Sequence, residues 1–87
     1  MWGRYYLRDK QKREVDFLVA RDGTPWFIVE VKASDTHPSP SLGYFQTVTG
    51  ARHAFQAVFS EPFVAADCFS RTDPVMVSAR TLFSQLV

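Results

Sequence analysis

The chain of 87 residues has a single cysteine, Cys68, and no long run of apolar residues. One cysteine excludes a disulfide within the chain. Without a matching cluster of His and Cys, we expect no structural zinc site, and we interpret Cys68 as a small buried hydrophobe. No apolar stretch approaches the roughly 20 residues of a membrane-spanning helix. The first residues, MWGRYYLRDK, lack the hydrophobic segment of a secretory signal, so we expect a cytoplasmic protein without membrane contact.

The chain is too short for more than one small domain, and we take residues 1–87 as that domain. Eight Phe, three Tyr and two Trp among 46% hydrophobic residues are enough to form a core.

Basic side chains are concentrated at the start of the chain, although the net charge is only +1. Five of them stand in residues 1–13 against Asp9 alone: Arg4, Arg8, Lys10, Lys12 and Arg13. Such a cluster attracts phosphate, which makes these residues candidates for nucleic-acid binding. The alternative is a solvated strand edge or hairpin tip that its charges protect from aggregation.

The first third of the sequence predicts three strands. Residues 4–8 are rich in aromatics, and residues 14–20 and 26–32 alternate between polar and apolar side chains. We expect residues 21–25, with Asp-Gly at their middle, to form a five-residue hairpin loop. Ala20 then opposes Trp26, and the same register sets Asp16 against Glu30 and Glu14 against Lys32.

The rest of the chain predicts a helix, two further strands and a short terminal helix. The helix begins near Ser39 or Ser41 and ends at Gly50. Its apolar stripe contains Tyr44, Val48 and Ala51, joined by Leu42 and Phe45. We expect an alternating strand over residues 54–60, a short strand over 75–78, and a helix over 80–86 that buries Leu82, Phe83 and Leu86. The order β-β-β-α-β, followed by a short strand and helix, predicts an α/β (α+β) fold with a mixed sheet.

Three carboxylates and one ammonium share a face of the predicted hairpin: Glu14, Asp16, Glu30 and Lys32. Like charges directly opposed are destabilising, so Asp16 facing Glu30 invites a cation between them. Mg²⁺ takes oxygen ligands of this kind, often one or two carboxylates with waters and phosphate oxygens. The alternative is a solvated sheet surface on which Glu14 and Lys32 form a modest ion pair.

Asp16, a turn, and Glu30-Val31-Lys32 at the end of an apolar strand resemble the PD-(D/E)xK nuclease-like superfamily. More narrowly, REVDFLVARDGTPWFIVEVKAS followed by TGARHAFQAVFS resembles the C-terminal domain of unknown function of bacterial and archaeal AAA-type ATPases. The resemblance implies a restriction-endonuclease-like fold, in which Asp16, Glu30 and Lys32 are catalytic. Asp16 and Glu30 would bind Mg²⁺ or Mn²⁺, with Glu14 as an accessory group and a nucleic-acid phosphodiester as substrate.

The chain departs from that superfamily in several places. No leading helix precedes Trp2, Val15 stands where a Pro is usual, and the ATPase phosphate loop of the fused relatives is missing. Some branches of the superfamily have a Gln on this helix and a Tyr four residues later. Here the accessory Gln46 is followed at that spacing by Gly50, so only half of this signature is present. These departures support the alternative of a catalytically inactive nuclease-fold module for binding or oligomerisation. A homodimer or a protein partner would then cover the face left by the leading helix.

Overall fold

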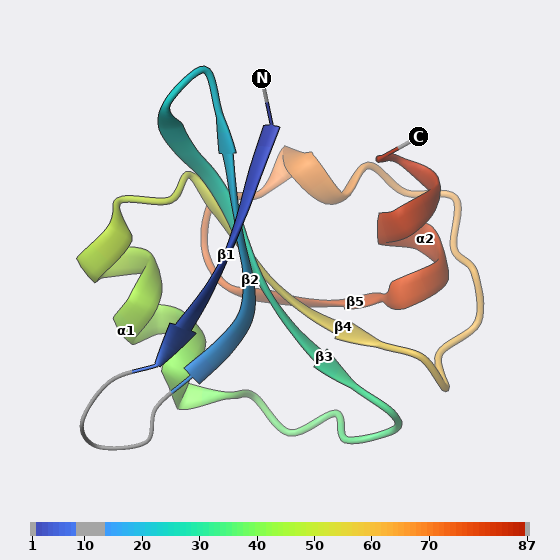
Figure 1. The fold of residues 1–87 in the computed structure, drawn as a ribbon. Helices are drawn as coiled ribbons and strands as arrows, with labels where there is room; N and C mark the ends of the chain where they lie inside the picture. The colour runs from blue at the N-terminus through green and yellow to red at the C-terminus, as the bar shows by residue number, and fades with distance from the viewer. Residues whose placement is uncertain (1, 9–13, 87) are drawn as a thin grey trace.

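The computed structural model describes residues 2–8 and 14–86, with side chains from Asp16 to Leu86. Its elements are β1 (Trp2–Arg8), β2 (Glu14–Arg21), β3 (Thr24–Lys32), α1 (Pro40–Thr49), β4 (His53–Val58), the 3₁₀ helix η1 (Cys68–Ser70), β5 (Val75–Ser78) and α2 (Ala79–Ser84). The predicted α/β (α+β) class and element order are confirmed (Figure 1).

One mixed sheet contains all the described strands, in the order β1-β2-β3-β4-β5. β1, β2 and β3 are antiparallel, whereas β4 runs parallel to both β3 and β5. Every residue of β4 is buried, as expected of a central strand covered on both faces. The predicted alternation over residues 54–60 is therefore wrong, and Phe59 lies beyond the strand with 48% of its surface exposed.

The β2–β3 hairpin has a shorter turn than predicted but nearly the predicted register. Asp22 and Gly23 form a two-residue turn, both with positive φ, and Arg21 pairs with Thr24. This geometry suits the right-handed strand twist and favours Asp-Gly. The expected opposition of Ala20 and Trp26 is wrong, because a bulge at Trp26 adds one residue to β3. Beyond the bulge, the expected register returns in the pairs Val19–Phe27, Leu18–Ile28 and Phe17–Val29.

α1 covers one face of the sheet, where Leu42 and Phe45 pack against Ile28 and Ala54. The helix begins at Pro40 and ends where expected, because Gly50 adopts the left-handed conformation and its N–H donates to the Gln46 carbonyl. Val48 departs from the predicted apolar stripe. It is 62% exposed, because the helix contacts the sheet through the side that carries Leu42 and Phe45.

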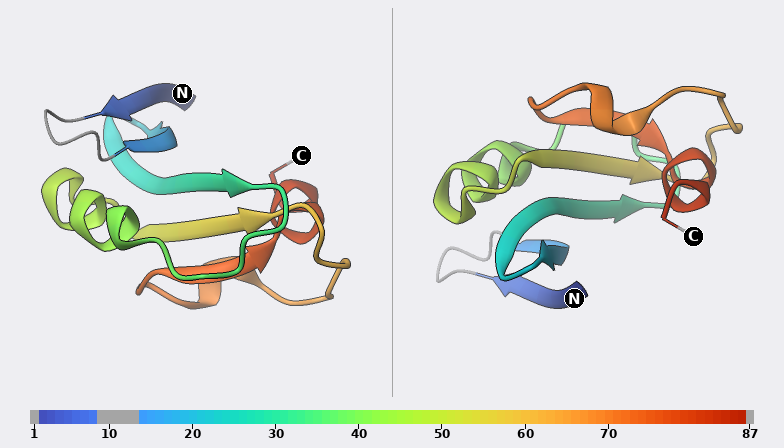
Figure 2. Two further views of the ribbon diagram at one scale, coloured as in Figure 1. Left: turned by 90° about the horizontal axis from the view of Figure 1, so that it is seen from below. Right: turned by 90° about the horizontal axis from the view of Figure 1, so that it is seen from above.

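α2 and the segment containing η1 lie against the other face of the sheet (Figure 2). Leu82 is fully buried beside Phe27 and Phe55. Phe83 does not follow the prediction of burial: it is 37% exposed, and α2 ends at Ser84. None of the helices in the described part of the chain is long and apolar enough to cross a membrane.

Candidate functional site

The carboxyl end of β3 places Glu30 and Lys32 on the same face of the sheet, since alternate strand residues share a face. Their side chains form an ion pair, with 3.0 Å between Lys32 Nζ and Glu30 Oε1. Glu30 keeps only 14% of its side-chain surface exposed and Lys32 keeps 33%. The ammonium is therefore at the mouth of the site, and the carboxylate lies beneath it.

The second carboxylate oxygen of Glu30 has no hydrogen-bond partner. Within residues 16–86, Oε2 of Glu30 is the one buried side-chain nitrogen or oxygen atom in this condition. A buried polar atom without a partner carries its full desolvation cost. A ligand at Oε2 would remove this cost.

Asp16 lies at an irregular position of β2, directly beside this end of β3. Tyr5 pairs with Leu18 and Leu7 with Val15, so β2 has an extra residue in the bulge that contains Asp16. Bulges often re-aim side chains next to functional sites. Here Oδ2 of Asp16 accepts a hydrogen bond of 2.6 Å from the Val31 backbone N–H.

The structure thus brings the Asp16 carboxylate to the backbone of β3 directly after Glu30, although Asp16 and Glu30 are not paired in the ladder. The β2–β3 pairing ends at Phe17–Val29, one position before the predicted pair. Asp16 contacts β3 through its side chain instead. Because a carboxylate has about four lone-pair positions, the bond to Val31 leaves it capacity to bind a cation.

Lys32 is held in its charged form. The hydrogen bond that Lys32 donates to Glu30 raises the pKa of Lys32 above 10.5, and the charges of Glu30, Asp35 and Asp16 add to the increase, while partial burial opposes it. At neutral pH the side chain is therefore an ammonium. It can donate to a phosphate oxygen, but it cannot accept a proton from water.

Gln56 supports the site and was missed by the sequence reasoning. It pairs with Glu30 across the parallel β3–β4 ladder and is 2% exposed. Its Oε1 accepts from the Ser39 N–H, and its Nε2 donates to the carbonyls of Asp35 and His37. These bonds fix the segment that follows Lys32. The available signal was a lone amide within the otherwise apolar stretch of residues 54–58.

Gln46 is not brought to the site. It lies in the last turn of α1, which precedes the start of β4, whereas Lys32 is beside the end of β4. Its Nε2 donates to the Thr72 carbonyl at 2.5 Å, which fastens the segment before β5. Its predicted accessory role is therefore replaced by a structural one.

Other sequence predictions concern residues away from the carboxylates. His53 is a buried structural histidine, as expected, with Nδ1 at 2.5 Å from the Arg71 carbonyl. Cys68 is buried, and burial raises the pKa of its thiol. His37 is exposed, as expected, and contacts Asp35.

Six predicted site residues lie outside the part of the chain whose side chains are described. Glu14 pairs through its backbone with Arg8 of β1, and nothing is known of either side chain. The side chains of four further residues are likewise not described: Arg4, Lys10, Lys12 and Arg13. The accessory role of Glu14 and the basic nucleic-acid surface stay predictions.

The donor set suits a hard divalent cation that keeps most of its waters. Across the described residues, no group of three or more His, Cys, Asp or Glu side chains is arranged to hold a metal. Mg²⁺, however, is commonly bound by one or two carboxylates, with waters and substrate phosphates in its other positions. The partnerless Oε2 of Glu30, with the Asp16 carboxylate bonded to the backbone of the adjoining Val31, fits that mode.

Comparison with known proteins places the chain in a family. A family model described as "Domain of unknown function (DUF4143)" matches residues 2–68. The chain belongs to this family. The DUF4143 match spans Asp16, Glu30 and Lys32 and stops before β5. A search of curated proteins and a search of solved structures gave no match.

The DUF4143 match agrees with the narrower resemblance drawn from the sequence, to the domain of unknown function of AAA-type ATPases. It does not extend to the nuclease-like superfamily, and membership of that superfamily stays a prediction.

Proposed function

We propose that this DUF4143 domain is a metal-dependent hydrolase of nucleic-acid phosphodiester bonds, centred on Asp16, Glu30 and Lys32. The observation that carries the proposal is Oε2 of Glu30, a buried carboxylate oxygen without a partner. Glu30 is also paired with the charged Lys32, and the adjoining residue of β3, Val31, donates its backbone N–H to the carboxylate of Asp16. This combination supports both a cation and a phosphate group at one place.

Each side chain has a distinct role in this proposal. Asp16 and Glu30 would hold Mg²⁺ or Mn²⁺, which polarises the phosphate and lowers the pKa of a bound water. Lys32 would meet the negative charge of the scissile phosphate, because its ion pair with Glu30 keeps it protonated. The hydrogen bond between Asp16 and Val31 sets the position of the first carboxylate relative to β3.

The direct test is a cleavage assay with labelled single-stranded and double-stranded DNA and RNA, in Mg²⁺ or Mn²⁺. We expect cleavage by the unmodified chain and a loss of at least about 100-fold in Asp16→Asn, Glu30→Gln and Lys32→Gln. Asp16→Asn is informative because its side-chain oxygen still accepts from Val31, so charge is removed while the hydrogen bond stays.

Asp67→Asn is the matched control. Asp67 accepts from the Phe69 N–H at the start of η1, and Asn keeps that bond, so cleavage should be unchanged. Cleavage that survives in all three site variants would come from a contaminant and would contradict the proposal. Absence of cleavage on all four substrates would contradict it as well.

A second candidate function is association without catalysis, with another copy of the chain as the partner. An open hollow beside Asp16 is lined by apolar side chains, including Val31, Phe59 and Phe83. The rings of Phe59 and Phe83 lie 5.9 Å apart, and both are substantially exposed. Large exposed apolar patches are typical of interaction sites. Sedimentation equilibrium should then show a dimer that Phe59→Ser and Phe83→Ser weaken, and a monomer at all concentrations would remove this candidate.

A further inference from the structure

β5 is an edge strand of the sheet. Among the described strands it pairs only with β4, and residues of the segment 61–71 lie across a cavity from it. Within the described residues, no backbone hydrogen bond joins that segment to β5. An edge strand of this kind carries a row of N–H and C=O groups that are available to another extended chain.

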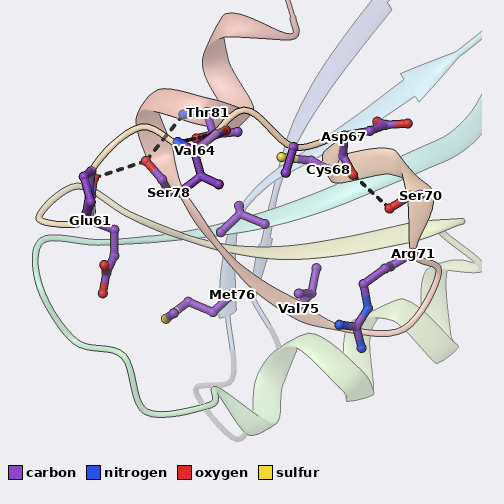
Figure 3. Close-up of a pocket in the computed structure, with 13 residues that line it drawn as sticks. Glu61, Val64, Asp67, Cys68, Ser70, Arg71, Val75, Met76, Ser78 and Thr81 are labelled. Carbon is purple, nitrogen blue, oxygen red and sulfur yellow. Dashed lines mark hydrogen bonds between the residues drawn. The ribbon is translucent and has the colours of Figure 1, made fainter.

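A cleft of about 370 Å³ follows this edge (Figure 3). All four residues of β5 line it, from Val75 to Ser78. Successive side chains of a strand point to opposite faces, so a cavity that touches four residues in a row runs along the strand's edge. Its opposite wall contains Val64 and Ala66, and the lining is mainly apolar.

The far wall of the cleft is held by α2 and its capping residue. Thr81 Oγ1 donates to the Val64 carbonyl at 3.0 Å and accepts from the Val64 N–H at 2.8 Å. Ser78 Oγ donates to the Glu61 carbonyl at 3.1 Å. Figure 3 shows these hydroxyls at one end of the cleft. These hydroxyls satisfy the backbone groups of Val64 and the carbonyl of Glu61; Ser78, the last residue of β5, does so through its side chain, and within the described residues no backbone hydrogen bond joins the wall to β5.

Gln85 holds the other part of the wall in the same way. Its Oε1 accepts from the Cys68 N–H at 3.0 Å, and its Nε2 donates to the Ala66 carbonyl. Because both parts of the segment are bonded to the region of α2, the wall does not close onto β5. The cleft is therefore preformed, which lowers the entropic cost of binding.

We propose that this cleft binds an extended apolar peptide segment of a partner protein, which pairs with the free edge of β5 as an additional strand. Recognition of this type combines main-chain hydrogen bonds with pockets for alternate side chains. A strand that is already part of another sheet cannot pair with β5. The strand beside it in that sheet would collide with the wall formed by residues 61–71. For the same reason, β5 of a second copy cannot enter: it brings its own wall.

The charges at the cleft favour a basic residue in the segment. Glu61 and Asp67 are among the lining residues, and Arg71 is the one basic residue among them. Arg71 is already paired with Asp73, at 2.9 Å between Nη2 and Oδ2. The remaining charge around the cleft is therefore negative, and it complements a lysine or arginine at one end of the peptide.

The test uses a synthetic peptide with alternating valines, acetyl-Lys-Val-Ser-Val-Ser-amide. Titration of the isotopically labelled chain should give saturable shifts of the backbone amide signals of residues 75–78, with slower hydrogen exchange in β5. The same peptide with N-methylated valines keeps the side chains but loses the backbone donors. It should bind about tenfold more weakly or worse.

Two neighbouring alanines provide a matched pair of variants. Ala66 lines the cleft and Ala65 does not, and both are exposed. Ala66→Phe should fill the cleft and weaken peptide binding at least tenfold, whereas Ala65→Phe should leave it unchanged. Circular dichroism of both variants checks that each is folded.

Three outcomes would overturn the proposal. The first is the absence of shifts in β5 at millimolar peptide. The second is equal affinity for the N-methylated peptide, which would mean that the cleft recognises side chains alone. The third is equal binding by folded Ala66→Phe and Ala65→Phe, which would place the peptide elsewhere. None of these results depends on catalysis at Asp16 and Glu30.

Discussion

Glu30 uses its two carboxylate oxygens differently. Oε1 pairs with Lys32, and Oε2 is buried without a partner. Such an atom is costly in a domain this small, because the net stability of a folded chain is only about 0.05–0.15 kcal/mol per residue. A Gln at position 30 would have nearly the same shape and no charge to bury. We therefore interpret the charged Glu30 as retained because a ligand binds its Oε2.

The Lys32–Glu30 pair should make a pH-dependent contribution to stability. The pKa of Lys32 is raised above 10.5 in the folded state, mainly by the hydrogen bond with Glu30. The contribution is therefore complete below about pH 10.5 and is lost as the pH rises through the folded-state pKa. Urea unfolding of the unmodified chain and of Lys32→Met should differ by a constant amount from pH 7 to pH 9 and by less above pH 10.5. A difference that grows with alkaline pH would contradict this assignment.

Two glycines, one inside α1 and one directly after it, provide a test of where this helix ends. Gly43 lies inside the helix with open space around its Cβ position, whereas Gly50 ends the helix with φ +74°. Gly43→Ala should stabilise the chain by about 1 kcal/mol, because Gly costs about that much in a helix interior. Gly50→Ala should destabilise it by about 1 kcal/mol or more, because an L-residue is strained at this φ. Thermal unfolding of the two variants gives the comparison, and equal signs would contradict the helix boundary.

The sequence predicted best the helix and strand positions that depend only on residues close together in the chain. Gly50 ended the helix as expected, and alternation located β2 and β3. The hairpin turn was wrong because a bulge at Trp26 depends on the packing of that ring against Phe69, a partner distant in the chain. The burial of β4 could not be read from its own pattern, since α1 covers one face of this strand and η1 and α2 cover the other.

At the candidate site, too, some features follow from nearby residues in the sequence and others depend on distant contacts. Asp16, Glu30 and Lys32 were found from spacing, and their proximity follows from the hairpin register. The contact between Asp16 and Val31 was not predictable, because it depends on a bulge against β1. Gln56 was missed, since its three hydrogen bonds go to a segment with no regular structure.

For the whole molecule, stability should depend on one aromatic cluster around β4. Phe55 is fully buried, and its ring lies 5.7 Å from Phe27 and 5.2 Å from Phe69. Phe55→Ala should cost about 3–5 kcal/mol, a large part of the total stability of a domain of this size. Phe63→Ala is the matched control: Phe63 is 56% exposed, and its change should stay within about 0.5 kcal/mol. Urea unfolding measures both, and similar losses would contradict the location of the core.

Mn²⁺ titration of the isotopically labelled chain, observed through its backbone amide signals, shows directly whether a cation binds at Glu30. We expect selective broadening around Asp16 and residues 30–32, reversal by excess Mg²⁺, and loss of the effect in Glu30→Gln but not in Asp67→Asn. Glu30→Gln keeps the size of the side chain, so the comparison isolates the carboxylate charge. Broadening that is uniform along the chain, or that persists unchanged in Glu30→Gln, would contradict a cation site at Oε2 of Glu30 and the hydrolase function built on it.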